Sequence, residues 1–214
     1  MTGKYYLIGI LLTVAVLVAT VVAYPHLPST VATHWNLRNQ VDGYSAKWTL
    51  FLMGPGLMAG IMVLWRFLPW LSPKNFEVDS FRSTYFQIML IVVSLLAYFN
   101  AAVLWAGVGY SLNVGRAIVG GLCLLVALLG NLLGKVRRNF YIGVRTPWAL
   151  ANERVWNATH RFAAKTFVAG GLVGLALTAV GLQGRAVFVV LLAALIPAVY
   201  SLAFYKQLER RGEL

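Results

Sequence analysis

Charged residues are scarce in this chain of 214 residues, where they make up 11% of the sequence. A typical soluble domain carries about 25% charged residues. Hydrophobic residues supply 60% of the chain, and the mean hydropathy is +0.75. The shortage of charge therefore excludes an ordinary soluble domain and indicates a membrane protein.

Cysteine occurs once, as Cys123, inside an apolar stretch. A single thiol supports neither a disulfide framework within the chain nor a metal site built from several cysteines. We expect Cys123 to pack against a neighbouring helix. We also expect no metal and no cofactor, because His34 and Asp42 are too few ligands for a metal site.

Acidic residues are also scarce, and all six lie outside the long apolar stretches. They are Asp42, Glu77, Asp79, Glu153, Glu209 and Glu213. Ion-coupled transporters usually need an ionisable group at membrane depth, so this distribution argues against a coupled transporter. Asn100 and Asn131 are polar exceptions within the apolar stretches, and we expect each to hydrogen-bond between helices.

Six apolar stretches are long enough to cross a hydrocarbon core, which takes about 20 residues of helix. They run from Tyr5 to Tyr24, Trp48 to Trp70, Thr84 to Val108, Val114 to Gly134, Phe162 to Gly181 and Ala186 to Tyr205. Uninterrupted apolar stretches satisfy their backbone in lipid as helices. The predicted fold class is therefore all-α, a polytopic membrane bundle of six transmembrane helices. Because no small-residue cleavage site follows the first stretch, we expect it to remain in the mature protein.

Small residues four apart predict close contacts between these helices. Such pairs occur at Gly56/Gly60, Gly130/Gly134 and Gly170/Gly174. We assign helix packing in particular to Gly130, Asn131 and Gly134.

Basic residues set the expected orientation, because cytoplasmic loops are enriched in Lys and Arg. With the N-terminus inside, only Arg38, Lys47, Arg116 and Arg185 fall outside, and the other 14 of the 18 basic residues fall inside. We therefore predict that both termini are cytoplasmic. The net charge of +12 reflects this bias and favours anionic membrane lipids as partners, rather than direct binding of nucleic acid.

The loop from Tyr24 to Trp48 is predicted to lie outside as a compact two-stranded flap. Asn39-Gln40 and Asp42-Gly43 have the chemistry of turns. The loop also offers an imidazole, an amide, a carboxylate and aromatic rings, from His34, Trp35, Asn36, Asp42 and Tyr44. Two interpretations stay open: a recognition surface, or a flap whose aromatic rings anchor it at the headgroups while Asn36 and Asp42 bond its turns.

The stretch from Val136 to Arg161 is rich in arginine and tryptophan and is predicted to be cytoplasmic. Thr146 before Pro147, and Asn152 farther on, are typical helix N-caps. Glu153, Trp156 and His160 share one face of the helix that follows. That face suits either a partner protein or the headgroup region, and we predict a docking element in which Arg145 bonds the carbonyl end of the fourth transmembrane helix.

Two motifs in these loops resemble a known family. The stretch "THWN…DGY", from Thr33 to Tyr44, resembles the DUF1648 pattern, although Ala32 and Asn39 replace its usual Pro and Gly. The stretch "GNLLGKVRRNFYIGVRTPWALANERVWNATHR", from Gly130 to Arg161, resembles the signature of the SdpI family of bacterial sporulation-delaying-toxin immunity proteins. The resemblance divides the chain into a DUF1648-like region, 1–80, and an SdpI-like region, 81–214.

The resemblance implies a multi-pass protein of the bacterial cytoplasmic membrane that is not an enzyme and protects its producer from a secreted, membrane-active peptide toxin. It also implies a possible cytosolic partner, a transcriptional repressor held at the membrane. The implied recognition residues on the outer loop are His34, Trp35, Asn36, Asp42, Gly43 and Tyr44. The implied cytoplasmic motif consists of Asn139, Gly143, Arg145, Thr146, Pro147, Trp148, Glu153, Trp156 and His160.

Two rival functions remain open. One is a small permease or lipid-handling protein, which would need a continuous polar path between helices. The other is a membrane hydrolase built on His34 and Asp42, for which a nucleophile is missing from the outer face.

Overall fold

The computed structural model describes residues 3–36, 38 and 40–214. Six of its helical segments are long and apolar enough to cross a membrane: Gly3–His26, Thr49–Leu71, Asp79–Gly107, Val114–Leu133, Glu153–Ala179 and Gln183–Arg210. The prediction of an all-α bundle with six spanning segments is confirmed.

The helices and strands follow one another in a simple order. The helices are α1 (Gly3–Ala23), α2 (Thr49–Phe51), α3 (Leu57–Phe67), α4 (Arg82–Gly107), α5 (Val114–Leu133), α6 (Pro147–Ala151), α7 (Glu153–Ala179) and α8 (Gln183–Arg210). The strands are β1 (Thr30–Trp35) and β2 (Val41–Ala46), which form an antiparallel pair. Short single turns complete the second and third spans and the end of α1.

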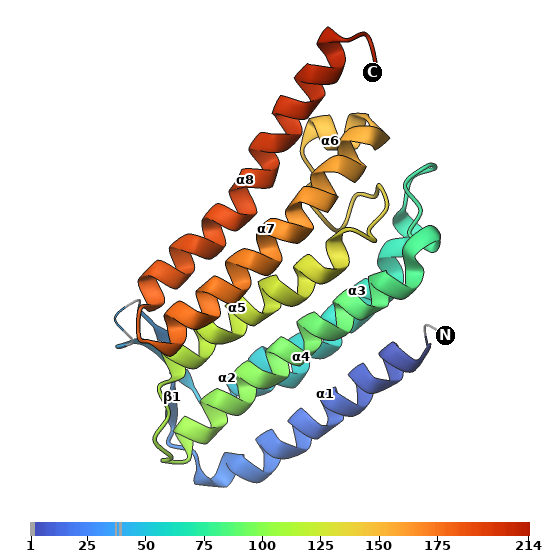
Figure 1. The fold of residues 1–214 in the computed structure, drawn as a ribbon. Helices are drawn as coiled ribbons and strands as arrows, with labels where there is room; N and C mark the ends of the chain where they lie inside the picture. The colour runs from blue at the N-terminus through green and yellow to red at the C-terminus, as the bar shows by residue number, and fades with distance from the viewer. Residues whose placement is uncertain (1–2, 37, 39) are drawn as a thin grey trace.

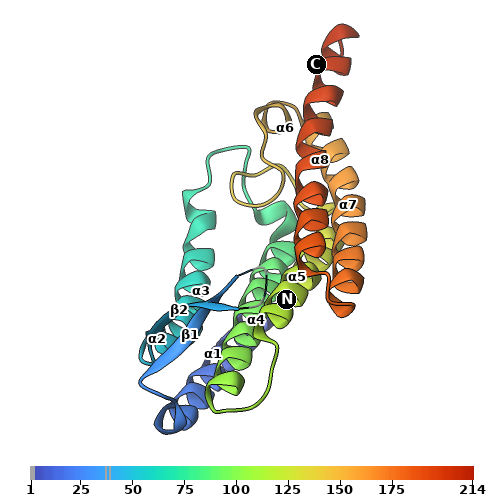
Figure 2. The same cartoon turned by 90° about the vertical axis from the view of Figure 1, so that its left-hand side faces the viewer.

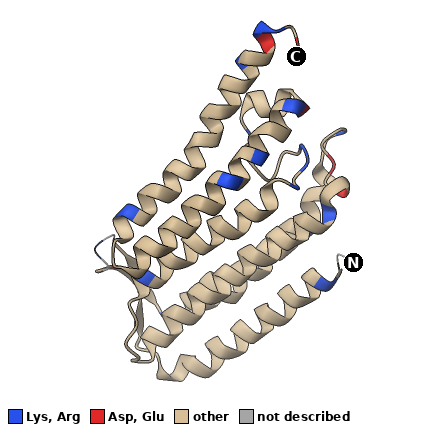
Figure 3. Ribbon diagram, viewed as in Figure 1, with Lys and Arg blue, Asp and Glu red and all other residues tan. Residues whose placement is uncertain are grey.

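The long helices lie side by side in the order α1, α4, α5, α7, α8, with α3 packed behind α4 (Figure 1). Both termini and α6 lie at one end of the bundle, which we call the terminus end. The strands lie at the opposite end, the hairpin end, and Figure 2 shows them in front of α4, which β1 contacts. Lys and Arg gather at the terminus end (Figure 3), which we predict to be cytoplasmic.

The second span is irregular because Pro55 interrupts it. A π-helical turn, Leu52–Gly56, joins α2 to α3. Proline has no backbone N–H and cannot continue a regular helix. The buried side chain of Asn100 on α4 faces this turn, and a Cβ on Gly54 would overlap its amide nitrogen.

Asn100 confirms the prediction that polar residues join the helices. Its Nδ2 donates to the Leu50 carbonyl at 3.5 Å, and its Oδ1 accepts from the Thr20 hydroxyl at 3.3 Å. The same prediction is wrong for Asn131, whose side chain is exposed and has no hydrogen bond among the described residues. The preceding Gly130 faces α7, and one residue farther along a helix points about 100° away.

The predicted glycine contacts are confirmed in part. A Cβ on Gly130 would lie 2.7 Å from the Val168 backbone nitrogen, and one on Gly174 would lie 2.7 Å from the Cys123 sulfur. Gly170 faces Ala193 of α8 in the same way. The packing prediction is wrong for Gly134 and Gly60, since a Cβ at either position would meet nothing within 4 Å among the described residues. Glycine therefore lets α7 approach α5 on one side and α8 on the other.

Candidate functional site

The hairpin, residues 30–46, confirms the predicted two-stranded flap and is fixed to the helix ends by its base. Val31 is 3% exposed and belongs to a small apolar cluster with Leu27, Leu50 and Leu104. The Lys47 ammonium donates to the carbonyls of Tyr24 and Leu27, at 3.0 and 3.2 Å. The base of the hairpin is thus held by apolar packing and by hydrogen bonds.

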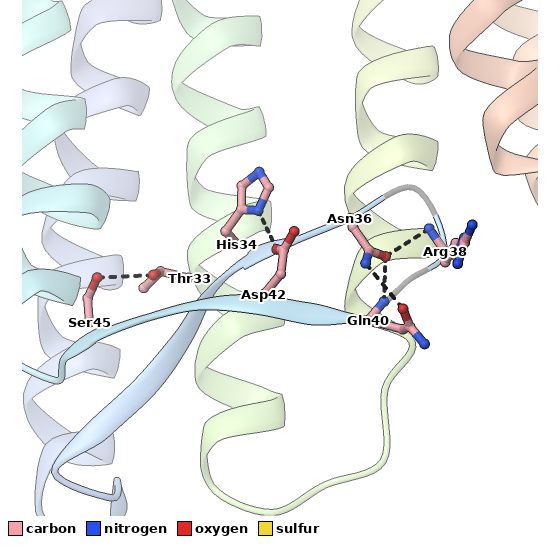
Figure 4. Close-up of polar contacts among 7 residues, drawn as sticks. All are labelled: Thr33, His34, Asn36, Arg38, Gln40, Asp42 and Ser45. Carbon is pink, nitrogen blue, oxygen red and sulfur yellow. Dashed lines mark hydrogen bonds and ion pairs between the residues drawn. The ribbon is translucent and has the colours of Figure 1, made fainter.

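The turn of the hairpin depends on Asn36. Its Oδ1 accepts from the backbone nitrogens of Arg38 and Gln40, at 2.9 and 3.0 Å (Figure 4). Its own backbone N–H donates to the Gln40 carbonyl at 2.9 Å. These contacts favour the turn-building interpretation of Asn36, while the predicted role of Asn39 lies outside the described residues.

The prediction that Asp42-Gly43 forms a turn is wrong. Both residues lie within β2, where Gly43 is opposite His34 at an irregular step in the register. A Cβ on Gly43 would lie 2.8 Å from the His34 Cβ, so the absence of a side chain serves the close approach of the strands.

The exposed surface of the hairpin carries a histidine–aspartate pair. His34 Nδ1 and Asp42 Oδ1 lie 2.5 Å apart, and their side chains are 71% and 44% exposed. The other ring nitrogen of His34 points away from the strands (Figure 4). Tyr44 is 67% exposed, whereas Trp35 is half-buried. The structure therefore brings His34 and Asp42 together and leaves them accessible.

At the terminus end, the prediction that Trp156 faces a partner or the headgroups is wrong. Trp156 is 0% exposed, and its indole nitrogen donates to the Val136 carbonyl at 2.9 Å. Its ring stacks on His160, which is 1% exposed, with the ring centroids 3.9 Å apart. The loop of residues 134–152 folds back over this face of α7, so the aromatic rings form a core instead of a surface. Glu153, at the start of α7, is exposed.

His160 holds the loop through both ring nitrogens. Its Nε2 accepts from the Val144 backbone N–H at 3.1 Å, so the ring proton is on Nδ1, which donates to the Trp156 carbonyl at 2.9 Å. Gly143 has φ +113° and lies against this ring, where a Cβ would overlap Nε2. Glycine is therefore required at position 143 for both its backbone conformation and its lack of a side chain.

Asn139 is fully buried and organises the start of the loop. Its Nδ2 donates to the carbonyls of Arg137 and Ile142, at 2.8 and 3.1 Å. Its Oδ1 accepts from the backbone nitrogens of Tyr141 and Ile142, at 2.7 and 2.8 Å. The amide thus uses its full hydrogen-bonding capacity inside the loop.

The predicted helix caps are confirmed. Thr146 Oγ1 accepts from the Ala149 nitrogen at 3.2 Å, with Pro147 in the first turn of α6, and its hydroxyl lies 2.7 Å from that of Ser201 on α8. Asn152 accepts from the nitrogens at the start of α7. Trp148 is half-buried against the main apolar core.

Arg145 bonds a different carbonyl from the one predicted. Its guanidinium donates to the Phe140 carbonyl within the same loop, not to the end of α5. The loop turns back on itself after Asn139, whose side chain accepts from the Tyr141 and Ile142 nitrogens, and the Phe140 carbonyl lies within reach of Arg145. Arg154 is exposed and pairs with Glu213 near the C-terminus at 2.8 Å.

The chain has the architecture of a polytopic membrane protein, with six spanning segments and a hairpin at one end. At the other end is a loop whose conformation is held by hydrogen bonds that involve Asn139, Trp156 and His160. Residues 135–203 match the model of the SdpI/YfhL protein family, and residues 11–59 match a domain of unknown function, DUF1648. The chain is 25% identical over 208 residues to "Immunity protein SdpI" of Bacillus subtilis (strain 168), covering 96% of this chain and 98% of that protein. No solved structure gives a significant match.

These matches confirm the resemblance to the SdpI family, with an N-terminal region of the DUF1648 type. They also support a location in the bacterial cytoplasmic membrane as a multi-pass protein. The division of the chain at residue 80 stays a prediction.

Proposed function

We propose that this chain is a membrane immunity protein that protects its cell from a secreted, membrane-active peptide toxin. The observation that carries the proposal is the similarity to Immunity protein SdpI, which extends over 96% of the chain and includes both loops. The proposed role is stoichiometric protection and not catalysis.

We assign toxin recognition to the exposed surface of the hairpin. His34, Asp42 and Tyr44 present an imidazole, a carboxylate and an aromatic ring on one small element. Such a set can bond the polar groups of a peptide and pack against its apolar side chains. Trp35 and Gly43 support this surface from within the strands, and Asn36 maintains its turn.

The proposal can be tested by expressing the chain in a Bacillus subtilis strain that lacks Immunity protein SdpI. We expect viable counts after exposure to the sporulation-delaying peptide toxin to recover to those of the protected parent strain. Loss of viability despite normal amounts of the chain in the membrane would contradict the proposal.

The same assay tests the hairpin surface. Asp42→Ala and Tyr44→Ala should reduce protection while the amount of protein in the membrane is unchanged, because both side chains are exposed and bury little. Ser111→Ala, an exposed change in the α4–α5 loop, is the matched control and should protect fully. Full protection by all three variants would remove the hairpin from the recognition site.

We further propose, on the same resemblance, that the terminus end holds a transcriptional repressor at the membrane. With Trp156 buried, the exposed residues Arg145, Pro147 and Glu153 are the available contacts. A photo-crosslinking residue at position 147 should capture the repressor in toxin-treated cells. Capture that is equally strong with the crosslinker at the exposed position 46, at the hairpin end, would contradict this role.

A further inference from the structure

A cavity of about 510 Å³ lies at the terminus end, between the ends of α5, α7 and α8. Gly134 and Phe204 form its apolar walls. Its polar walls are the side chains of Arg137, Arg154, Asn157 and Arg161, and Ala158 completes the lining. Arg154, Asn157, Ala158 and Arg161 lie on one face of α7, because they occupy positions i, i+3, i+4 and i+7 of the helix.

The charge of this cavity is positive. Three guanidinium groups and one amide line it, and none of its described lining residues is acidic. Within the described part of the chain, Arg137 and Arg161 form no ion pair. Bringing three arginines together costs free energy unless anions join them, and among the described residues only Arg154 has an acidic partner.

The structure already places one anionic group at the rim. Arg154 donates from Nη2 to the Glu213 carboxylate at 2.8 Å and from Nη1 to the Glu213 carbonyl at 3.3 Å. The guanidinium fork is thus oriented to bind two oxygens of one partner, as it binds a phosphate.

The cavity lies where the surface of α7 changes from charged to apolar. Lys165 is exposed one turn beyond Arg161, and farther along the same helix the exposed side chains are apolar, with Leu172 at 56% and Val173 at 49%. Lipid phosphates occupy this boundary in a bilayer, and their acyl chains lie against the apolar surface beyond it.

We infer that this cavity binds the phosphate of an anionic phospholipid. Arg137, Arg154 and Arg161 bind the phosphate oxygens, Asn157 donates an additional hydrogen bond, and Phe204 packs against the start of the acyl chains. Basic pockets between spanning helices suit anionic headgroups because each cation near the phosphate contributes favourably. Glu213 competes for Arg154 and weakens binding. The inference is independent of the immunity role.

The test uses the purified full-length chain in a zwitterionic detergent, with phosphatidylglycerol added as the probe and native mass spectrometry as the readout. Wild type should retain the lipid, and Arg137→Gln/Arg161→Gln should bind it about 30-fold less tightly, on the order of 1 kcal/mol for each of the two cations lost. Arg66→Gln/Arg210→Gln removes the same charge from exposed positions outside the cavity and should bind as wild type does. Glu213→Gln should bind more tightly.

A second measurement separates the lipid from free phosphate. Phosphatidylglycerol should raise the melting temperature of wild type, whereas inorganic phosphate should not. Equal stabilisation by both would overturn the lipid assignment, and equal losses of lipid in the cavity and control variants would overturn the site. Arg161→Gln alone changes one exposed side chain and tests the site in a chain that retains Arg137.

Discussion

At the scale of single residues, Gly143 and His160 constrain each other. The ring nitrogen that accepts from Val144 occupies the space that a Cβ on residue 143 would need. Gly143→Ala should therefore lower the free energy of unfolding by about 1–3 kcal/mol, the cost of a strained backbone, before any displacement of His160 is added. Thermal unfolding in detergent measures this loss.

Gly134→Ala is the matched control for Gly143→Ala. Its φ is −63°, and a Cβ there would meet nothing within 4 Å among the described residues. We expect its melting temperature to equal that of wild type or to exceed it. A similar loss of melting temperature in both variants would show that the close contact of Gly143 and Val144 with the His160 ring contributes little to stability.

Arg145 and Arg154 are expected to differ in their response to lysine. Arg145 donates to the Phe140 carbonyl across its own loop, a contact that depends on the shape of the guanidinium, whereas Arg154 is an exposed partner of Glu213. Arg145→Lys should reduce protection from the toxin, and Arg154→Lys should not. Viable counts at equal membrane amounts compare them, and equal tolerance would mean that charge alone matters in this loop.

The residue-scale predictions succeeded where the chemistry is local. The capping roles of Thr146 and Asn152 depend on the next three residues, so the sequence was sufficient to predict them. The burial of Trp156 depends on how the loop of residues 134–152 folds back, and an aromatic residue beside cations fits a headgroup region equally well. Periodicity places Trp156 and His160 on one face but does not identify what covers that face.

At the scale of elements, the turn of the hairpin depends on the side-chain amide of Asn36. Asn36→Ala removes the acceptor for the backbone nitrogens of Arg38 and Gln40, so the turn should loosen. Limited proteolysis of the purified protein should then cleave the hairpin several-fold faster than in wild type. Gln40→Ala is the control, because it removes only the side-chain contact with Asn36 and keeps the backbone bonds. Unchanged cleavage of Asn36→Ala would contradict the turn-building role.

The hairpin also shows which secondary-structure features could be predicted from the sequence and which could not. Prolines and turn-forming residues were sufficient to predict two strands in the loop from Tyr24 to Trp48. One of the two predicted turn pairs was wrong, because Asp42-Gly43 has the composition of a turn but lies in β2, with Gly43 opposite His34. Pairing register depends on which strand residues face the core, and here Val31 alone is deeply buried in the described strands.

At the scale of the whole molecule, the structure places the hairpin and α6 at opposite ends of the bundle. In a Cys123→Ala background, Ala46→Cys should react with a membrane-impermeant thiol reagent added to intact cells, and Ala151→Cys should not. Both positions are exposed, so access to the reagent and not burial decides the result. The opposite labelling pattern would reverse the predicted orientation.

The number of spanning segments was predictable because hydropathy alone determines it. The order in which the helices pack was not, because apolar helix surfaces in lipid resemble one another in sequence. Glycine pairs illustrate the difference: Gly130 and Gly174 contact neighbouring helices, while Gly134 and Gly60, in identical spacing, do not.

The unequal distribution of cations between the two ends also means that an inserted molecule can reverse its orientation in the membrane only very slowly. Of the 18 Lys and Arg residues, 14 lie in segments assigned to the terminus end. Each cation costs about 2.5–3.5 kcal/mol or more to carry through the centre of a bilayer. A molecule that had inserted backwards would have to carry most of this charge across lipid to correct itself. Such an error would persist for the lifetime of the protein, so quality control has to act while the chain is being inserted.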